Sequence, residues 1–153
     1  MTIQANDRFN EGQKVYPVIT PALDPLLDAH LIDARDFCDT WMTSCWRGYI
    51  ASWRIVDGEL LLWKLRVPSG LQWIDAPKEL KAEVLALSGS SKFPVFANWF
   101  TGDFIIGLGE RYPSGFAFGL YEIERIFTIK NGLVHRERRK RRIARSWIDM
   151  ARR

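Results

Sequence analysis

The fold is decided by the stretch CWRGYIASWRIVDGELLLWKLRV, residues 45–67. Asp57-Gly58 separates two runs that are rich in β-branched and aromatic residues. A two-residue Asp-Gly loop is typical of a type I′ turn, because both of its central residues need positive φ. The stretch therefore predicts a β-hairpin with strands near residues 46–56 and 59–67.

The side-chain pattern of this hairpin indicates where it lies in the sheet. If Val56 pairs with Glu59, then Trp53 lies opposite Leu62 on one face. The other predicted pairs are Ile55 with Leu60, Arg54 with Leu61 and Ser52 with Trp63. Both faces then carry large apolar side chains, so we expect the hairpin inside the sheet and not at its edge.

Two more hairpins and one helix are predicted from local signals. The run FPVFANWFTGDFIIGLG, residues 93–109, reads as two strands about a tight turn at Thr101-Gly102. Asn131-Gly132 gives a third two-residue turn, after a strand in which apolar and polar residues alternate. The apolar spacing in DAPKELKAEVLAL, residues 75–87, predicts one short amphipathic helix.

The charges divide the chain into two parts. Residues 135–153 contain nine Lys or Arg and two acidic residues, a net charge of +7, whereas residues 1–134 have a net charge of −3. In the basic part, Ile143, Trp147 and Met150 share a face at helical spacing. The sequence therefore predicts a mildly acidic body followed by a basic amphipathic helix over residues 135–153.

Three interpretations of this basic segment remain open. Its cations can contact nucleic-acid phosphates, which gives a steep salt dependence. They can instead steer an acidic protein partner, with the face around Trp147 entering a groove. In the third interpretation the helix packs on the body and its cations are only solvated. The candidate binding residues are Arg136, Arg138, Arg139, Lys140, Arg141, Arg142, Arg145 and Trp147.

Three arginines are the most informative polar residues of the body. Arg47, Arg54 and Arg125 fall within otherwise apolar strands. An inward-pointing Arg must be paired or must line a pocket. We expect structural ion pairs, for which Glu59, Glu122 and Glu124 are plausible partners, more than an anionic-ligand pocket built from the three.

No convincing catalytic set is present. The only histidines are His30 and His135, and a triad of a Cys45 or Ser44 nucleophile with His30 and an Asp is compatible with any spacing, since triads are assembled in space. Glu122 and Glu124 project from the same face of a predicted strand about 7 Å apart, a separation that paired glycosidase carboxylates can use, but they occupy the polar phase of the strand. Two cysteines are too few for a disulfide framework or a zinc site, so we predict no metal and no cofactor.

Three motifs carry a resemblance to a family. CWRGYIASWRIVDGELLL, VFANWFTGD and GFAFGLYE, in that order, resemble a group of small hypothetical bacterial proteins, and YPVITPALDPLL looks like their usual beginning. The resemblance spans roughly residues 8–134. It implies a bacterial source and no particular activity, cofactor or site residue, and the basic segment lies outside it.

Together these patterns predict one α+β domain over residues 1–134. We expect a mostly antiparallel sheet or open barrel of three hairpins, with one short internal helix and the basic C-terminal helix packed on or extending from it. No apolar run is long enough to span a bilayer and no signal peptide is seen, which indicates a cytoplasmic protein. The leading function is a non-catalytic accessory or inhibitor protein that binds a protein partner. The alternative is nucleic-acid binding, and a hydrolase is a distant third.

Overall fold

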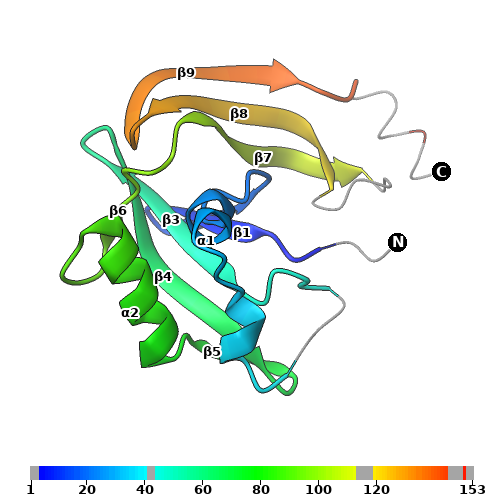
Figure 1. Cartoon of the computed structure of the whole chain (residues 1–153). Coiled ribbons are helices and arrows are strands. Elements are labelled where there is room, and N and C mark those ends of the chain that lie inside the picture. The colour runs from blue at the N-terminus through cyan, green and yellow to red at the C-terminus, as the bar shows by residue number, and fades with distance from the viewer. Residues whose placement is uncertain (1–3, 41–43, 113–118, 145–149, 151–153) are drawn as a thin grey trace.

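The computed structural model describes residues 4–40, 44–112, 119–144 and 150. Within them, nine strands form one mixed sheet, and two α-helices and a 3-10 helix lie beside it (Figure 1). The strands are β1 (Asp7–Glu11), β2 (Lys14–Val18), β3 (Ile50–Val56), β4 (Glu59–Ser69), β5 (Gln72–Asp75), β6 (Val95–Phe96), β7 (Gly102–Tyr112), β8 (Leu120–Lys130) and β9 (Leu133–Arg141). The helices are α1 (Asp24–Ala29), the 3-10 helix η1 (Ala34–Phe37) and α2 (Lys78–Ser88). None of these described helices is long and apolar enough to cross a membrane.

The sheet closes into a ring. Its strands follow the order β3-β1-β2-β7-β8-β9-β4, and β4 pairs with β3, while β5 and β6 add to β4. All described pairings are antiparallel except that of β1 with β3. Two links are single residue pairs, Val18 with Ile106 between β2 and β7, and Glu59 with Leu133 between β4 and β9. The predicted β-rich fold is confirmed in this ring-like form.

The hairpin predicted at Asp57-Gly58 is confirmed as β3 and β4. Asp57 and Gly58 have φ of 52° and 77°, as a type I′ turn requires. Trp53 pairs with Leu62 as predicted, but a β-bulge follows, so Ser52 pairs with Lys64 and not with Trp63. Both strands have neighbours on either side, which places the hairpin inside the sheet.

The hairpin predicted at Thr101-Gly102 is wrong. β6 pairs with β4, whereas β7 pairs with β2 and β8. The amide of Phe100 donates to the carbonyl of Ala97, so the chain has already turned before it reaches Thr101. The hairpin predicted at Asn131-Gly132 is confirmed, and these residues have φ of 50° and 82° between β8 and β9.

The internal helix is confirmed as α2, which ends at Gly89 in the left-handed conformation with φ of 73°. It buries Leu80 and Val84, in line with the apolar spacing of the sequence. The structure adds a second short helix, α1, so the expectation of one internal helix is corrected. Pro25 lies in the first turn of α1, where a proline is tolerated because no intrahelical partner needs its amide.

The helix predicted from residue 135 is wrong over residues 135–141, because residues 133–141 form strand β9 (Figure 1). The Asn131-Gly132 turn directs the chain back along β8, and a ladder of eight residue pairs outweighs the good helix propensity of Arg and Lys. The boundary predicted after residue 134 therefore falls inside a strand. Beyond β9, the structure describes only residues 142–144 and Met150, so Arg145 and Trp147 lie outside the described residues.

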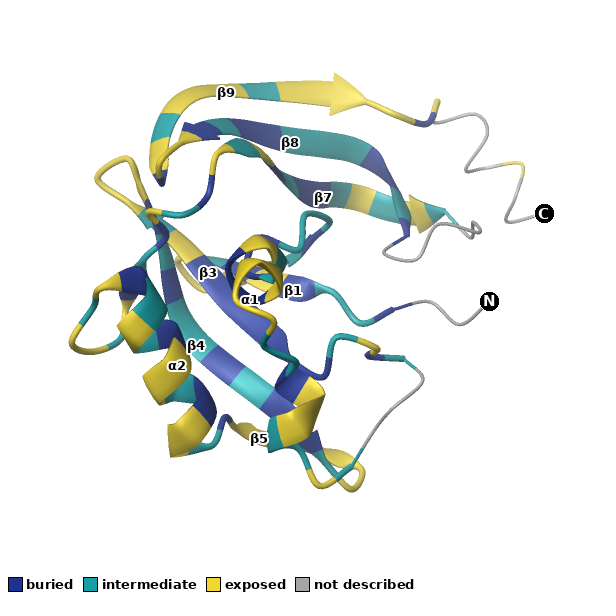
Figure 2. Ribbon diagram, in the orientation of Figure 1, coloured by how far each residue is buried: buried dark blue, intermediate teal, exposed yellow. Residues whose placement is uncertain are grey.

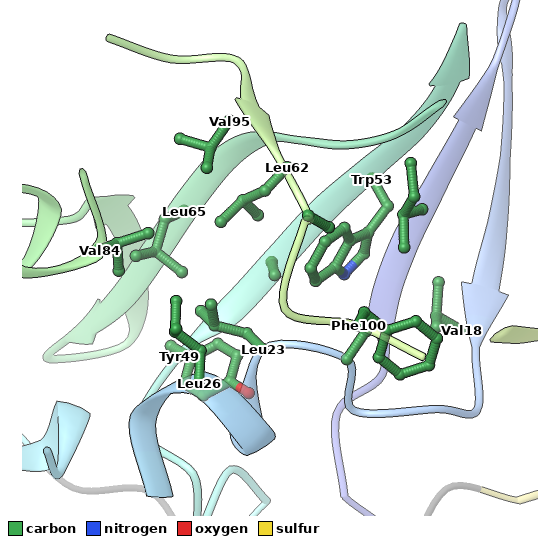
Figure 3. Close-up of a cluster of buried hydrophobic side chains, with 14 of the residues drawn as sticks. Val18, Leu23, Leu26, Tyr49, Trp53, Leu62, Leu65, Val84, Val95 and Phe100 are labelled. Carbon is green, nitrogen blue, oxygen red and sulfur yellow. The ribbon is translucent and has the colours of Figure 1, made fainter. Parts of the chain in front are cut away.

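Aromatic side chains fill the ring. Phe9 of β1 lies 6.1 Å from Phe104 of β7 and 5.7 Å from Phe127 of β8, measured between ring centroids. Trp53 of β3 meets the edge of Phe104 at 5.8 Å. Figure 3 shows Leu62 and other aliphatic side chains of the sheet and both α-helices gathered around Trp53. This core fixes the strands that carry the sites described next.

The two confirmed turns allow a matched stability test. A Cβ added at Gly58 would meet nothing within 4 Å, whereas one at Gly132 would lie 2.7 Å from the carbonyl oxygen of Ala97. Gly58→Ala should cost about 1 kcal/mol in the free energy of unfolding, because the positive φ of residue 58 is the only source of strain. Gly132→Ala should cost roughly 1–3 kcal/mol more, because packed backbone must also shift. Urea unfolding measures both, and equal losses would contradict the packing described at Gly132.

Candidate functional site

Strand β9 is exposed along most of its length (Figure 2). It pairs with β8 along its length except at His135, where the register shifts, but meets β4 only where Leu133 pairs with Glu59. There the amide of Val134 donates to the carbonyl of Gly58. From His135 to Arg141, the second edge of β9 has no strand partner among the described residues.

The orientation of this free edge follows from one hydrogen bond. The amide of Arg142 donates to the carbonyl of Glu122 on β8 at 2.9 Å. Because amides alternate between the two edges of a strand, those of Glu137, Arg139 and Arg141 point away from β8. These three positions present N–H and C=O groups on the free edge.

The structure brings most of the predicted cations together on β9. Three of them meet carboxylates of the neighbouring strands: Arg138 with Asp103 at 3.2 Å, Arg141 with Glu122 at 2.8 Å and, just after the strand, Arg142 with Glu124 at 3.7 Å. Arg136, Arg139 and Lys140 make no ion pair with any described residue. The strand therefore keeps a net positive charge that its neighbours do not neutralise.

The two glutamates considered as a catalytic pair hold this strand in place. Glu122 of β8 is only 5% exposed and faces the bulge of β7, where its Oε2 would be 2.7 Å from a Cβ at Gly109. Arg141 donates to its other oxygen, and Glu124 lies near Arg142. Each carboxylate thus faces an arginine of the chain's basic end, an arrangement that secures β9 on β8.

Arg125 joins three strands. It donates to Glu11 of β1 at 2.9 Å and to Glu137 of β9 at 2.5 Å, and its guanidinium lies 4.8 Å from the ring of Phe127. The hydrogen bond from Arg125 lowers the pKa of Glu11 below its ordinary value. Arg125 is therefore a structural ion-pair residue, as the sequence indicates, although its partners differ from the predicted ones.

Arg54 is exposed and stacks on Trp63, with 3.9 Å from the guanidinium carbon to the ring centroid. The indole of Trp63 donates to the side chain of Asn10, which fixes the ring. Arg54 and Arg47 line different cavities. The three arginines therefore have separate partners and are not assembled into one anion pocket.

Arg47 belongs to a buried ion pair, as the sequence indicates, but its partner Asp7 was not among the predicted ones. Its Nη2 donates to Asp7 at 2.8 Å, and the two side chains are 9% and 1% exposed. Asp7 also accepts from the amide of Ala51 at 3.0 Å and from the indole of Trp53 at 3.2 Å. Burial raises the pKa of Asp7, and the positive charge of Arg47 opposes that rise.

A cavity of about 510 Å³ lies beside this pair, between α1, η1 and the segment before β3. Its walls include Asp24, Asp28 and the half-exposed Trp46. Tyr49 donates its hydroxyl to Asp24, and burial raises the pKa of that carboxyl. With Arg47 paired to Asp7, these carboxylates make the cavity unsuited to an anionic ligand.

The nucleophile considered in the sequence is not activated. Cys45 is 1% exposed and donates its thiol to the carbonyl of Tyr49. Burial raises the pKa of the Cys45 thiol, which disfavours the thiolate that a nucleophile needs. His30, at the end of α1, is exposed.

No family model, curated protein or solved structure matches the chain, so its function is inferred from its own residues.

The Asp7–Arg47 pair predicts strong coupling between its members. Removing one partner leaves the other charge buried, so Asp7→Asn and Arg47→Met should each cost about 3–5 kcal/mol. The double variant should cost clearly less than the sum, because no uncompensated charge remains. Urea unfolding of the four proteins gives the coupling free energy, and additive losses would show that the two side chains do not act as a pair.

Proposed function

We propose that the protein is a non-catalytic binding protein of the accessory or inhibitor kind, and that it acts through contact with an acidic protein partner. One observation carries this proposal. Strand β9 is exposed, is paired along one edge only from His135 onward among the described residues, and contains five cations against the single acid Glu137. An element with these properties is suited to binding.

The distribution of charge supports an acidic partner. Residues 1–134 have a net charge of −3, so the positive charge is concentrated at one end of the chain and on one strand of the sheet. Such an arrangement attracts an acidic surface and orients it during encounter. Two copies of the protein also repel each other less than two copies with a uniformly basic surface would.

The backbone of β9 favours a polypeptide as the partner. Its free edge presents N–H and C=O groups that match those of another extended chain. A nucleic acid has no such ladder to offer. Proteins that hold single strands also use aromatic platforms, and β9 contains no Phe, Trp or Tyr.

Nucleic-acid binding remains a second candidate because of one feature of the same strand. Arg136, Arg139 and Lys140 are exposed and unneutralised within the described part of the chain. Phosphates would be suitable ligands for these cations. Binding of this kind would depend on charge and show little preference for sequence.

A charge-reversal variant tests the proposal. Arg136→Glu, Arg139→Glu and Lys140→Glu together should abolish binding to fluorescent poly-glutamate, measured by anisotropy near physiological salt of about 0.15 M. Charge reversal is preferred to deletion of β9, because the deletion would remove a strand of the sheet. The matched control is Arg8→Glu, Lys78→Glu and Lys92→Glu, which changes three exposed cations outside β9 by the same total charge.

The same titrations with single-stranded and duplex oligonucleotides separate the two candidates. Tighter binding of poly-glutamate, lost only in the β9 variant, supports the protein partner. If an oligonucleotide binds more tightly, and if the slope of log affinity against log salt concentration becomes shallower by about 2 in the β9 variant, nucleic acid becomes the first candidate. If the wild type binds neither polymer, or if the control loses binding equally, β9 is not the binding element.

A further inference from the structure

We propose that the acidic partner binds as an added β-strand on the free edge of β9. This inference rests on the proposed function and specifies how that function is carried out. The occupant is an extended acidic polypeptide segment that continues the sheet beyond β9. Three features of the structure support it: the place where the ring opens, the orientation of the backbone groups and the charge on both faces of the strand.

Beyond the single pair of Glu59 with Leu133, β4 and β9 separate and the ring is open, because β4 pairs with another strand. After Glu59 pairs with Leu133, the next residues of β4, Leu61 and Leu62, pair with Phe96 and Val95 of β6. β9 meanwhile continues along β8, away from β4 (Figure 1). The position beside β9 that a further strand of the sheet would take is therefore left without one in the described structure.

The free edge is long enough to fix the register of an incoming strand. The amides of Glu137, Arg139 and Arg141 point outward, and their carbonyls accept on the same side. Opposite these residues, a partner of about five extended residues can form alternating hydrogen bonds. Backbone pairing of this kind requires an N–H on alternate residues of the partner.

The side chains then select an acidic sequence. Arg136, Arg138 and Lys140 lie on one face of β9, since they pair with Thr128, Ile126 and Glu124 of β8. Arg139 and Arg141 lie on the other face, together with Glu137. A strand laid beside β9 therefore meets cations on both of its faces, and carboxylates at successive positions complement them.

The same charges exclude a second copy of β9 as the occupant. Pairing of two β9 edges would place arginines and lysines opposite one another, which destabilises a sheet. An edge protected only against self-association would bind no peptide at all. The test must therefore distinguish a merely protected edge, a charge-only contact and a strand-adding contact.

Two fluorescent peptides make this distinction. Both have ten residues of glutamate, valine and threonine in the same order, and in the second every residue is N-methylated, which keeps the charge and removes the amides along both edges of the peptide strand. We expect the first peptide to bind and the N-methylated peptide to bind at least about tenfold more weakly, because several backbone hydrogen bonds are lost.

A protein variant tests the same contact from the other side. Arg139→Pro removes an outward amide and leaves the ladder to β8 intact, since proline is tolerated where a strand's N–H faces solvent. Arg139→Ala is the matched control for loss of the charge. Arg139→Pro should bind the first peptide roughly five- to tenfold more weakly than Arg139→Ala, with far-ultraviolet circular dichroism and melting temperature unchanged between the two.

The outcomes separate the inference from the proposed function. Preference for the unmethylated peptide together with the loss in Arg139→Pro supports strand addition. Equal binding of the two peptides, sensitive to the β9 charge-reversal variant, would leave the acidic partner in place and overturn strand addition. Absence of binding by either peptide and by poly-glutamate would overturn both.

Discussion

A buried carboxylate at the start of β1 is the interaction on which the rest of the structure depends. Asp7 accepts from the guanidinium of Arg47, the amide of Ala51 and the indole of Trp53, and so attaches β1 to β3. The backbone register between those two strands comprises only two residue pairs. The cost of burying the charge is offset by this complete set of donors. Apart from β1, the layer of β7, β8 and β9 meets the hairpin of β3 and β4 through the single residue pair between β4 and β9 and through the packing of Trp53 on Phe104.

The order of the strands in the closed sheet determines which edge of β9 is free. With β1 fixed on β3, β2 leads to β7 and the antiparallel layer reaches β9 as its last member. β4 already pairs with β3, β5 and β6, so it shares one residue pair with β9 and no more. The result is a strand with one free edge among the described residues. Its cations repel the β9 strand of a second copy and attract an acidic strand. The same charges therefore disfavour self-association and favour the partner.

The sequence predicts those parts of the fold that local chemistry decides. The turns at Asp57-Gly58 and Asn131-Gly132 are correct, because each depends on residues that tolerate positive φ. The turn at Thr101-Gly102 and the helix over residues 135–141 are wrong, because strand partners far away in the chain decide them. The candidate binding cations at positions 136 and 138–141 were predicted on a helix and lie on strand β9. Asp7 was missed, although it shares the apolar phase of β1 with Phe9, and an acid in that phase indicates a buried partner.

Amide hydrogen exchange of the free protein tests most directly whether β9 is a strand with one paired and one free edge. We expect alternation along the strand, with slow exchange at Arg138 and Lys140, whose amides point to β8, and fast exchange at Glu137 and Arg139. Uniform protection would mean that the outer edge is already covered. Uniformly fast exchange would mean that the segment does not pair with β8, and either result would contradict a strand with one free edge.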